Sequence, residues 1–104
     1  MAVSDIFGAV ANPVRRRILN LLRERPRAAG DIARSFELQR PAVSEHLQVL
    51  RNVGLVSEQV EGRRRIYHLN PEPLEEVREW LNPFESYWRE RLEALKNLLN
   101  SEDL

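Results

Sequence analysis

The sequence predicts a mainly α-helical domain with one small β-hairpin and a long C-terminal helix. Apolar residues recur at helical spacing over most of the chain, two short alternating segments flank an arginine-rich turn, and one apolar stripe continues to Leu99. Residues 39–69 are the most informative, because a helix that suits a groove is followed directly by a basic hairpin. This order is typical of a winged helix-turn-helix, and the stripe predicts that the protein is dimeric.

Length and composition favour one domain over residues 1–104, of ordinary globular character. Hydrophobic residues make up 42% of the sequence and charged residues 31%. No apolar run reaches the roughly 20 residues that span a bilayer, and the N-terminus lacks the order of a secretion signal, so we expect no membrane partner. With no cysteine, disulfides and thiolate metal sites are excluded, and the cytoplasm is the expected compartment.

The net charge of zero conceals a strong segregation of charge. Residues 1–70 contain 12 Arg against seven Asp and Glu, whereas residues 71–104 contain four basic residues against nine acids. All but one of the basic residues are Arg, whose planar fork suits phosphate and guanine edges, although a biased base composition of the gene would produce the same excess. We therefore expect a DNA-binding core in 1–70 and C-terminal dimerisation helices in 71–104.

Four helices are expected before the hairpin, each with one apolar face. Ser4 is a suitable N-cap for the first, Pro13 opens the second, and Pro26 ends it. The four helices are expected over residues 5–11, 13–25, 29–36 and 40–52. Their apolar faces consist of Ile6, Phe7 and Val10; Val14, Ile18, Leu21 and Leu22; Ile32, Ala33 and Phe36; and Val43, Leu47 and Leu50.

The second half of the chain predicts a hairpin and then a helical segment. Gly54 suits a left-handed helix cap, and residues 55–60 and 65–69 alternate as strands. From Pro71 the pattern is helical again, and Pro83 either kinks this segment or begins a new helix. The apolar stripe consists of Val77, Leu81, Phe84, Trp88, Leu92, Leu95 and Leu99, widened by Trp80 and Tyr87.

This stripe is too long to be covered within a domain of this size, so a second subunit is its natural cover. The predicted dimer interface comprises Ile6, Phe7, Val10, Val77, Leu81, Phe84, Trp88, Leu92 and Leu95.

The outer flank of the predicted helix 40–52 carries side chains that suit base edges. Arg pairs with guanine and Gln with adenine, Ser permits close approach, and Glu45 is unfavourable near phosphate unless it accepts from cytosine. The alternative is a solvated face of a core helix. The expected recognition residues are Gln39, Arg40, Pro41, Ser44, Glu45 and Gln48.

The run Arg63-Arg64-Arg65 follows Gly62 at the hairpin tip. Three adjacent cations on a tight loop favour contact with phosphates or with a narrow minor groove, although a lone charge run is also typical of a solvated turn. Arg15 stands in an arginine run at the start of a helix, where cations oppose the macrodipole. We expect Arg15 and Arg51 to contact the DNA backbone as well; the alternative for Arg15 is an ion pair with an acid.

The whole pattern resembles the ArsR-type (ArsR/SmtB) winged-helix repressors over about residues 5–82. The ending PFESYWRERLEAL is similar to the SdpR-like branch, which has a longer last helix. The matching segments are Asn12-Pro13-Val14-Arg15-Arg16-Arg17-Ile18-Leu19, Asp31-Ile32-Ala33, Pro41-Ala42-Val43-Ser44, His46-Leu47, Val49-Leu50-Arg51, Gly54-Leu55-Val56 and Gly62-Arg63.

The resemblance implies a homodimer, joined through the first and last helices, that binds an inverted-repeat operator and represses transcription. It also implies that Arg40, Pro41, Ser44 and Glu45 lie at the bases. The chain departs from the family at Ala28 and Gln39, where relatives often have better N-caps, and at Glu45, where many carry a basic or polar residue. Metal-sensing members use Cys pairs or Asp/His sets that are missing here, so we expect no metal and no cofactor.

The sequence leaves two other functional classes as alternatives. A winged helix used only for protein contact would act through the C-terminal stripe, and an unknown effector could enter between the aromatic residues of that stripe and the first helix. An enzyme is disfavoured, since the sequence has no Gly-rich phosphate loop, no zinc motif and no nucleophile partner for His46 or His68.

Overall fold

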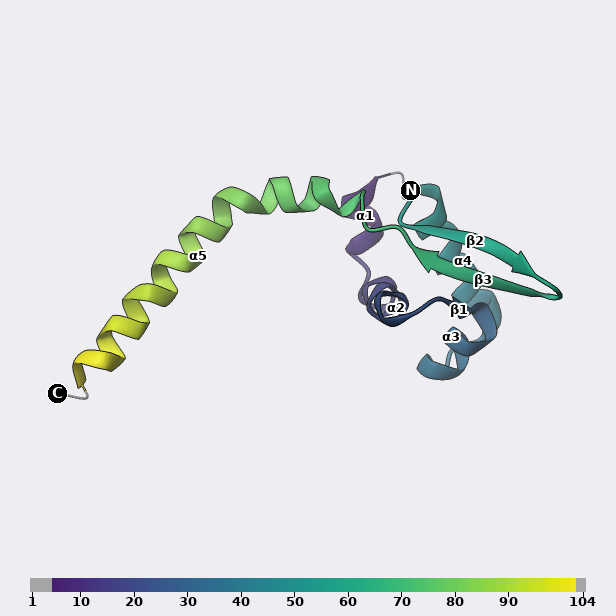
Figure 1. Ribbon diagram of the computed structural model, residues 1–104, viewed down its shortest axis with the longest axis horizontal. Helices are drawn as coiled ribbons and strands as arrows, with labels where there is room; N and C mark the ends of the chain where they lie inside the picture. Colours follow the sequence, from purple (N-terminus) through teal and green to yellow (C-terminus); the bar gives the residue numbers. More distant parts are fainter. Residues whose placement is uncertain (1–4, 103–104) are drawn as a thin grey trace.

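The computed structural model describes residues 5–102 and measures 64 × 28 × 24 Å along its principal axes. Figure 1 shows a globular part, formed by all elements up to β3, from which one long helix extends. The helices are α1 (Ile6–Val10), α2 (Pro13–Glu24), α3 (Ala29–Phe36), α4 (Arg40–Asn52) and α5 (Leu74–Glu102), and the strands are β1 (Arg27–Ala28), β2 (Val56–Glu61) and β3 (Arg64–Leu69).

The core lies where α2, α3 and α4 meet the sheet. The predicted apolar faces supply most of it, because residues three and four apart on a helix share one side. Half-buried Phe36 and Val14 close its edges. The largest side chains with less than 2% exposure are Ile18, Ile32, Val43, Leu47, Leu50 and Leu55.

The sheet has three antiparallel strands in the order β1-β3-β2. Strand β1 was not predicted, since two residues are too few to show an alternating pattern; Arg27 pairs with Tyr67. In the hairpin Glu61 pairs with Arg64, so the turn comprises only Gly62 and Arg63. Gly62 has φ +63°, which suits a tight hairpin turn and strains other residues.

Helices α1 and α2 each begin with a side-chain N-cap, whereas α3 and α4 begin without one. Asp5 accepts a hydrogen bond from the Gly8 amide at 2.7 Å and is the N-cap of α1, whereas the expected cap, Ser4, lies outside the described residues. Asn12 caps α2 by accepting from two amides. Ala28 and Gln39 make no side-chain cap bond, as their residue types predict.

Gly54 terminates α4 as predicted. Its φ is +81°, its amide donates to the Arg51 carbonyl at 3.0 Å, and the Leu55 amide donates to the Leu50 carbonyl at 3.0 Å. This pair of bonds is a Schellman motif, which satisfies carbonyls that the helix leaves free. It also turns the chain sharply into the hairpin, so the end of α4 and the start of β2 are held together.

Helix α5 is continuous, with Pro83 inside it, so of the two predicted alternatives the chain does not begin a new helix after Asn82. Figure 1 shows that α5 changes direction part-way along, as a proline inside a helix favours. Its first turns pack on the core through Leu74 and Val77, and Trp80 meets Phe7 of α1 edge to face at 6.0 Å. Within residues 5–102 no helix is long and apolar enough to cross a membrane.

Candidate nucleic-acid interface

Helices α3 and α4 are joined by three residues that set the angle between them. Glu37 adopts the left-handed conformation, with φ 55°, and the Leu38 amide closes the end of α3 by donating to the Ala33 carbonyl at 3.1 Å. Because Val43 and Leu47 are buried against the core, the opposite face of α4 is presented to solvent. The predicted recognition residues are all exposed: Gln39, Arg40, Pro41, Ser44, Glu45 and Gln48.

A hollow of about 730 Å³ lies between this exposed face of α4, the start of α3 and the hairpin. It brings together seven of the predicted DNA-contacting residues from two consecutive parts of the chain, α4 and the hairpin. Gln39, Pro41 and Glu45 are not among its lining residues. The predicted residues that line it are Arg40, Ser44, Gln48, Arg51, Arg63, Arg64 and Arg65.

One partly buried carboxylate on the hairpin, that of Glu58, pairs with two of these arginines. Glu58 on β2 lies 3.1 Å from Nη1 of Arg65 and 3.6 Å from Nη1 of Arg51. Burial, together with the hydrogen bond and charge of Glu58, raises the pKa of the neighbouring Tyr67 phenol, which therefore stays neutral. Glu58 thus joins the C-terminal end of α4 to the hairpin and fixes one wall of the hollow.

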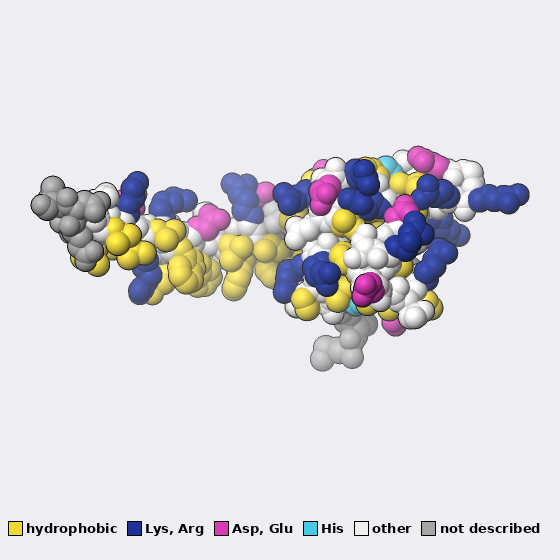
Figure 2. Space-filling view, turned by 90° about the horizontal axis from the view of Figure 1, so that it is seen from below, with side chains coloured by type: hydrophobic (Ala, Val, Ile, Leu, Met, Phe, Trp, Pro, Cys, Tyr) yellow, Lys and Arg dark blue, Asp and Glu magenta, His cyan; other side chains and the backbone are white. Residues whose placement is uncertain are grey.

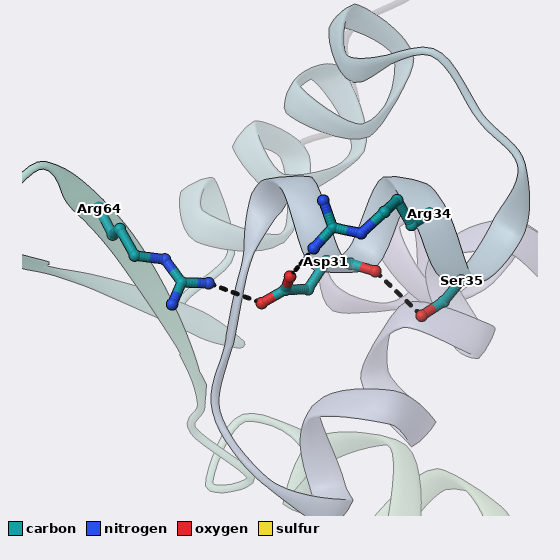
Figure 3. A network of polar contacts seen from close by, with 4 residues as sticks. All are labelled: Asp31, Arg34, Ser35 and Arg64. Carbon is teal, nitrogen blue, oxygen red and sulfur yellow. Dashed lines mark hydrogen bonds and ion pairs between the residues drawn. The ribbon is translucent and has the colours of Figure 1, made fainter.

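A second carboxylate, Asp31 in the first turn of α3, joins the opposite wall to the hairpin. It binds Nη2 of Arg64 at 2.8 Å and also pairs with Arg34 on the same helix. Figure 3 shows these two arginines approaching Asp31 from different elements, and Ser35 donating to the Asp31 carbonyl at 3.0 Å. By contrast, Arg40 and Arg63 form no ion pair within the described part of the chain.

The structure gives Arg15 a different role from the predicted contact with the DNA backbone. Its side chain is buried, and it donates to the Ala9 carbonyl at 2.7 Å and to the Gly8 carbonyl at 3.2 Å. Arg16 donates to the Val10 carbonyl at 2.8 Å. The cations that oppose the macrodipole of α2 therefore satisfy carbonyls at the C-terminal end of α1, where positive charge is favourable.

Arg15 also contacts α4. Its Nη1 donates to Nδ1 of His46 at 3.3 Å, which requires a neutral imidazole at this position. Burial and then the positive charge of Arg15 lower the pKa of His46, while Glu45 raises it. Among the residues that the structure describes, no group of three or more His, Asp or Glu is placed to hold a metal.

The residues predicted for a dimer interface fall into two groups. Ile6 is already covered by its own chain, and Phe7, Val10 and Val77 are half-buried. From Trp80 onward the stripe is exposed, and Figure 2 shows hydrophobic side chains following one edge of α5 while arginines gather over the globular part. The exposed members are Trp80, Leu81, Phe84, Tyr87, Trp88, Leu92, Leu95 and Leu99, and Leu98, which the predicted stripe did not include, is exposed as well.

Sequence reasoning missed the acidic residues that organise the hollow. Asp31 is an ordinary residue for a first helical turn, and Glu58 is an ordinary residue for a strand. Their partners Arg64 and Arg51 lie 33 residues further along and seven residues earlier, in other elements. No local pattern carries such a pairing, because it depends on how the hairpin folds back over α3 and α4.

A short helix pair whose second member is exposed, with a basic hairpin beside it, defines a winged helix-turn-helix protein. Comparison with known families agrees: residues 12–58 match the bacterial regulatory protein, arsR family. The HTH-type transcriptional regulator Rv2034 of Mycobacterium tuberculosis is 39% identical over 90% of this chain and 85% of its own length. The transcriptional repressor SdpR of Bacillus subtilis is 34% identical over 79% of this chain and 91% of its own.

The solved structures give the same result. The homodimeric winged helix-turn-helix DNA-binding domain of Mb0332 from Mycobacterium bovis superimposes with a TM-score of 0.61 and 31% identity, covering 75% of this chain and 72% of that one. The chain belongs to the ArsR family of bacterial regulatory proteins, as its motifs predicted. This is a family of transcriptional regulators rather than of enzymes.

Proposed function

We propose that this protein is a homodimeric, cytoplasmic repressor that binds an inverted-repeat operator in duplex DNA, without enzymatic activity. In each protomer α4 reads base edges in the major groove and the hairpin holds the adjacent backbone. The observation that carries the proposal is the arginine-lined hollow between them. A helix-turn-helix places its second helix in the groove, and the arginines supply the phosphate contacts that dominate affinity.

The residues have distinct roles in this proposal. Arg40 lies at the N-terminal end of α4, forms no ion pair in residues 5–102 and is free to pair with guanine. Gln48 donates to Asn52 at 2.9 Å along the helix surface and would exchange this bond for a base. Arg63, Arg64 and Arg65 hold the phosphates or enter the minor groove.

The exposed stripe supports the homodimer. Nine large apolar side chains on α5 are each 40–65% exposed, so the stripe offers on the order of 1,000 Å². A monomer rarely exposes so large a patch, whereas a stable interface needs about 800 Å² from each partner. The stripe continues directly from the contact of α5 with α1, so one surface formed by both helices would meet its copy across a two-fold axis.

Selection of bound duplexes from a random pool tests the proposal, followed by anisotropy titrations of the selected and scrambled duplexes at the same salt concentration. We expect the selected duplex to contain two inverted half-sites and to bind at least about a thousandfold more tightly than the scrambled one. Sedimentation should show a dimer at the same concentrations. Equal affinity for both duplexes would refute the proposal.

The second candidate, a winged helix that acts only by contacting another protein through the α5 stripe, is not favoured. In that case the exposed arginines of α4 and the hairpin have no role. Like charges on one surface repel one another, so a cluster without a role would be unfavourable. The two candidates differ in one measurement: substitutions at Arg40 and Arg64 leave the second function unchanged and impair the first.

A further inference from the structure

We propose that Arg34 and Arg64 form a clamp for one DNA phosphate, and that Asp31 occupies this clamp in the free protein and competes with the phosphate. The inference rests on the proposed DNA-binding function. It gives a role to two residues, Arg34 and Asp31, that are not among the predicted DNA-contacting residues. It also assigns an effect to Asp31, which is to lower the affinity of the protein for every duplex.

The geometry of the clamp is that of two cations around one anion. Nη2 of Arg64 donates to Oδ2 of Asp31 at 2.8 Å, and Nη2 of Arg34 pairs with Oδ1. Figure 3 shows Arg64 arriving from β3 and Arg34 from α3, so the two guanidinium groups converge from separate elements. The two free oxygens of a phosphodiester accept hydrogen bonds from guanidinium groups as the two carboxylate oxygens do.

The position of the clamp agrees with the path of a DNA backbone. All three residues line the same hollow as Arg40 and Ser44 of the recognition face. In a helix-turn-helix the first helix of the pair, here α3, crosses the backbone. The side chains of Arg34 and Arg64 are 76% and 61% exposed, so a ligand that approaches from solvent can reach both.

A purely structural role explains Asp31 less well. Ion pairs this exposed contribute little to the stability of a fold, whereas a carboxylate in the path of a phosphate repels it directly. With Asp31 present the cluster carries a net charge of +1, and without it +2. Because the repulsion acts on the backbone and not on the bases, it lowers affinity for operator and random DNA alike.

The test is the Asp31→Asn substitution in the full chain, measured by anisotropy on a selected duplex and on a scrambled duplex over a range of salt concentrations. We expect both dissociation constants to fall by about 3- to 10-fold at low salt. The slope of log affinity against log salt should steepen by about one for each protomer, or about two for a dimer. The ratio of the two affinities should not change.

Two controls separate competition from a general gain of positive charge. Glu37→Gln makes the same charge change on the residue that caps α3, outside the hollow, and should leave both affinities nearly unchanged. In a protein that carries Arg34→Gln and Arg64→Gln, the Asp31→Asn substitution should have a clearly smaller effect, because only the direct repulsion between Asp31 and the phosphate then remains. Thermal unfolding of each variant shows that its fold is retained.

The outcomes are separable. Equal or weaker binding by a folded Asp31→Asn protein would overturn the inference and show that Asp31 positions the hairpin. If that variant does not fold, Arg34→Gln decides: a loss of about threefold on every duplex supports the clamp, and no loss overturns it. If the unsubstituted protein prefers no duplex, the proposed function fails first and the inference falls with it.

Discussion

At the scale of single residues, the arginines of this chain divide into those that hold the protein together and those left for a ligand. Arg15 and Arg16 satisfy carbonyls of α1, and Arg17 stacks over the Phe36 ring at 4.6 Å. These roles need only internal partners. Arg40 and Arg63 are exposed and have no ion-pair partner in residues 5–102, so both guanidinium groups remain accessible to an external anion.

Arg40 and Arg64 should therefore respond differently to substitution. Arg40→Ala removes a base contact and should cost about 1–3 kcal/mol on the selected duplex while relaxing the base preference at one position of each half-site. Arg64→Ala removes a phosphate contact and should weaken all duplexes alike, with a salt slope smaller by about one per protomer. Titrations against a panel of single-base variants distinguish the two effects. A uniform loss for Arg40→Ala would contradict its role in reading bases.

His46 should make the stability of the protein depend on pH. Burial and Arg15 lower its pKa in the folded state, so the unfolded chain binds a proton more readily than the folded protein. This contribution to stability is fully present above the pKa of the unfolded state, near 6.5, and is lost as the pH falls through the lower folded value. Urea unfolding from pH 7.5 down to pH 5 measures it.

His46→Gln isolates this contribution, because a glutamine can still accept from Arg15 but does not titrate. The difference in unfolding free energy between the original protein and the variant should shrink or reverse as the pH falls through the titration of His46. Carboxylates titrate alike in both proteins and cancel in that difference. A difference that stays constant with pH would show that folding does not lower the pKa of His46.

At the scale of elements, α5 is the one helix that its own chain leaves largely uncovered. Its apolar residues from Val77 to Leu99 recur in steps of 4, 3, 4, 4, 3 and 4 residues, an 11-residue repeat close to the natural period of an α-helix. The stripe therefore stays on one side without marked supercoiling. Residues 74–86 are acidic on balance, whereas residues 87–99 are slightly basic, so an antiparallel copy of α5 is the electrostatically favoured partner.

A charge placed in this stripe should separate the subunits. Leu92 is 65% exposed in the protomer, so Leu92→Glu leaves the fold of the protomer intact. In the dimer it buries a carboxylate twice, and the dissociation constant of the dimer should rise at least about a hundredfold. Sedimentation measures the shift. Asn97→Glu adds the same charge outside the stripe and should leave the dimer intact; equal effects would contradict the assigned face.

At the scale of the whole molecule, the basic globular end suits contact with DNA, and the long projecting helix suits contact with a second subunit. Many basic side chains gather on the face of the globular end seen in Figure 2, while the long helix projects away from that end (Figure 1). A two-fold axis across α5 would present two identical hollows to one duplex. Two half-sites can be bound together only if they face the same side of the DNA, about one helical turn apart or a multiple of it.

Operator spacing should therefore control affinity. Inserting five base pairs between the half-sites rotates them by about half a turn, and affinity should fall toward that for a single half-site, at least about a hundredfold. A spacer of the original length with altered sequence is the control and should change affinity only slightly. Anisotropy titrations measure both duplexes. Tolerance of the five-base-pair insertion would show that the two protomers do not bind as a rigid pair.

The sequence alone determined the helices, the hairpin and the solvent-facing side of α4, because these follow from local periodicity and from a few capping and turn residues. The spacing of Val43, Leu47 and Leu50 placed Arg40 and Ser44 on the outer face. Gly54 and Gly62 marked the two turns, because both turns need a positive φ angle and glycine adopts one without strain. The family also followed from short local motifs.

Only the tertiary structure decided what the charged residues do, since charges interact across space without regard to sequence distance. It turned Arg15 inward against α1 and His46, added β1 through its pairing with β3, and placed Asp31 between Arg34 and Arg64. It also kept α5 continuous through Pro83, because a first turn packed on the core through Leu74 and Val77 and a long apolar face favour a helix that a proline bends without ending.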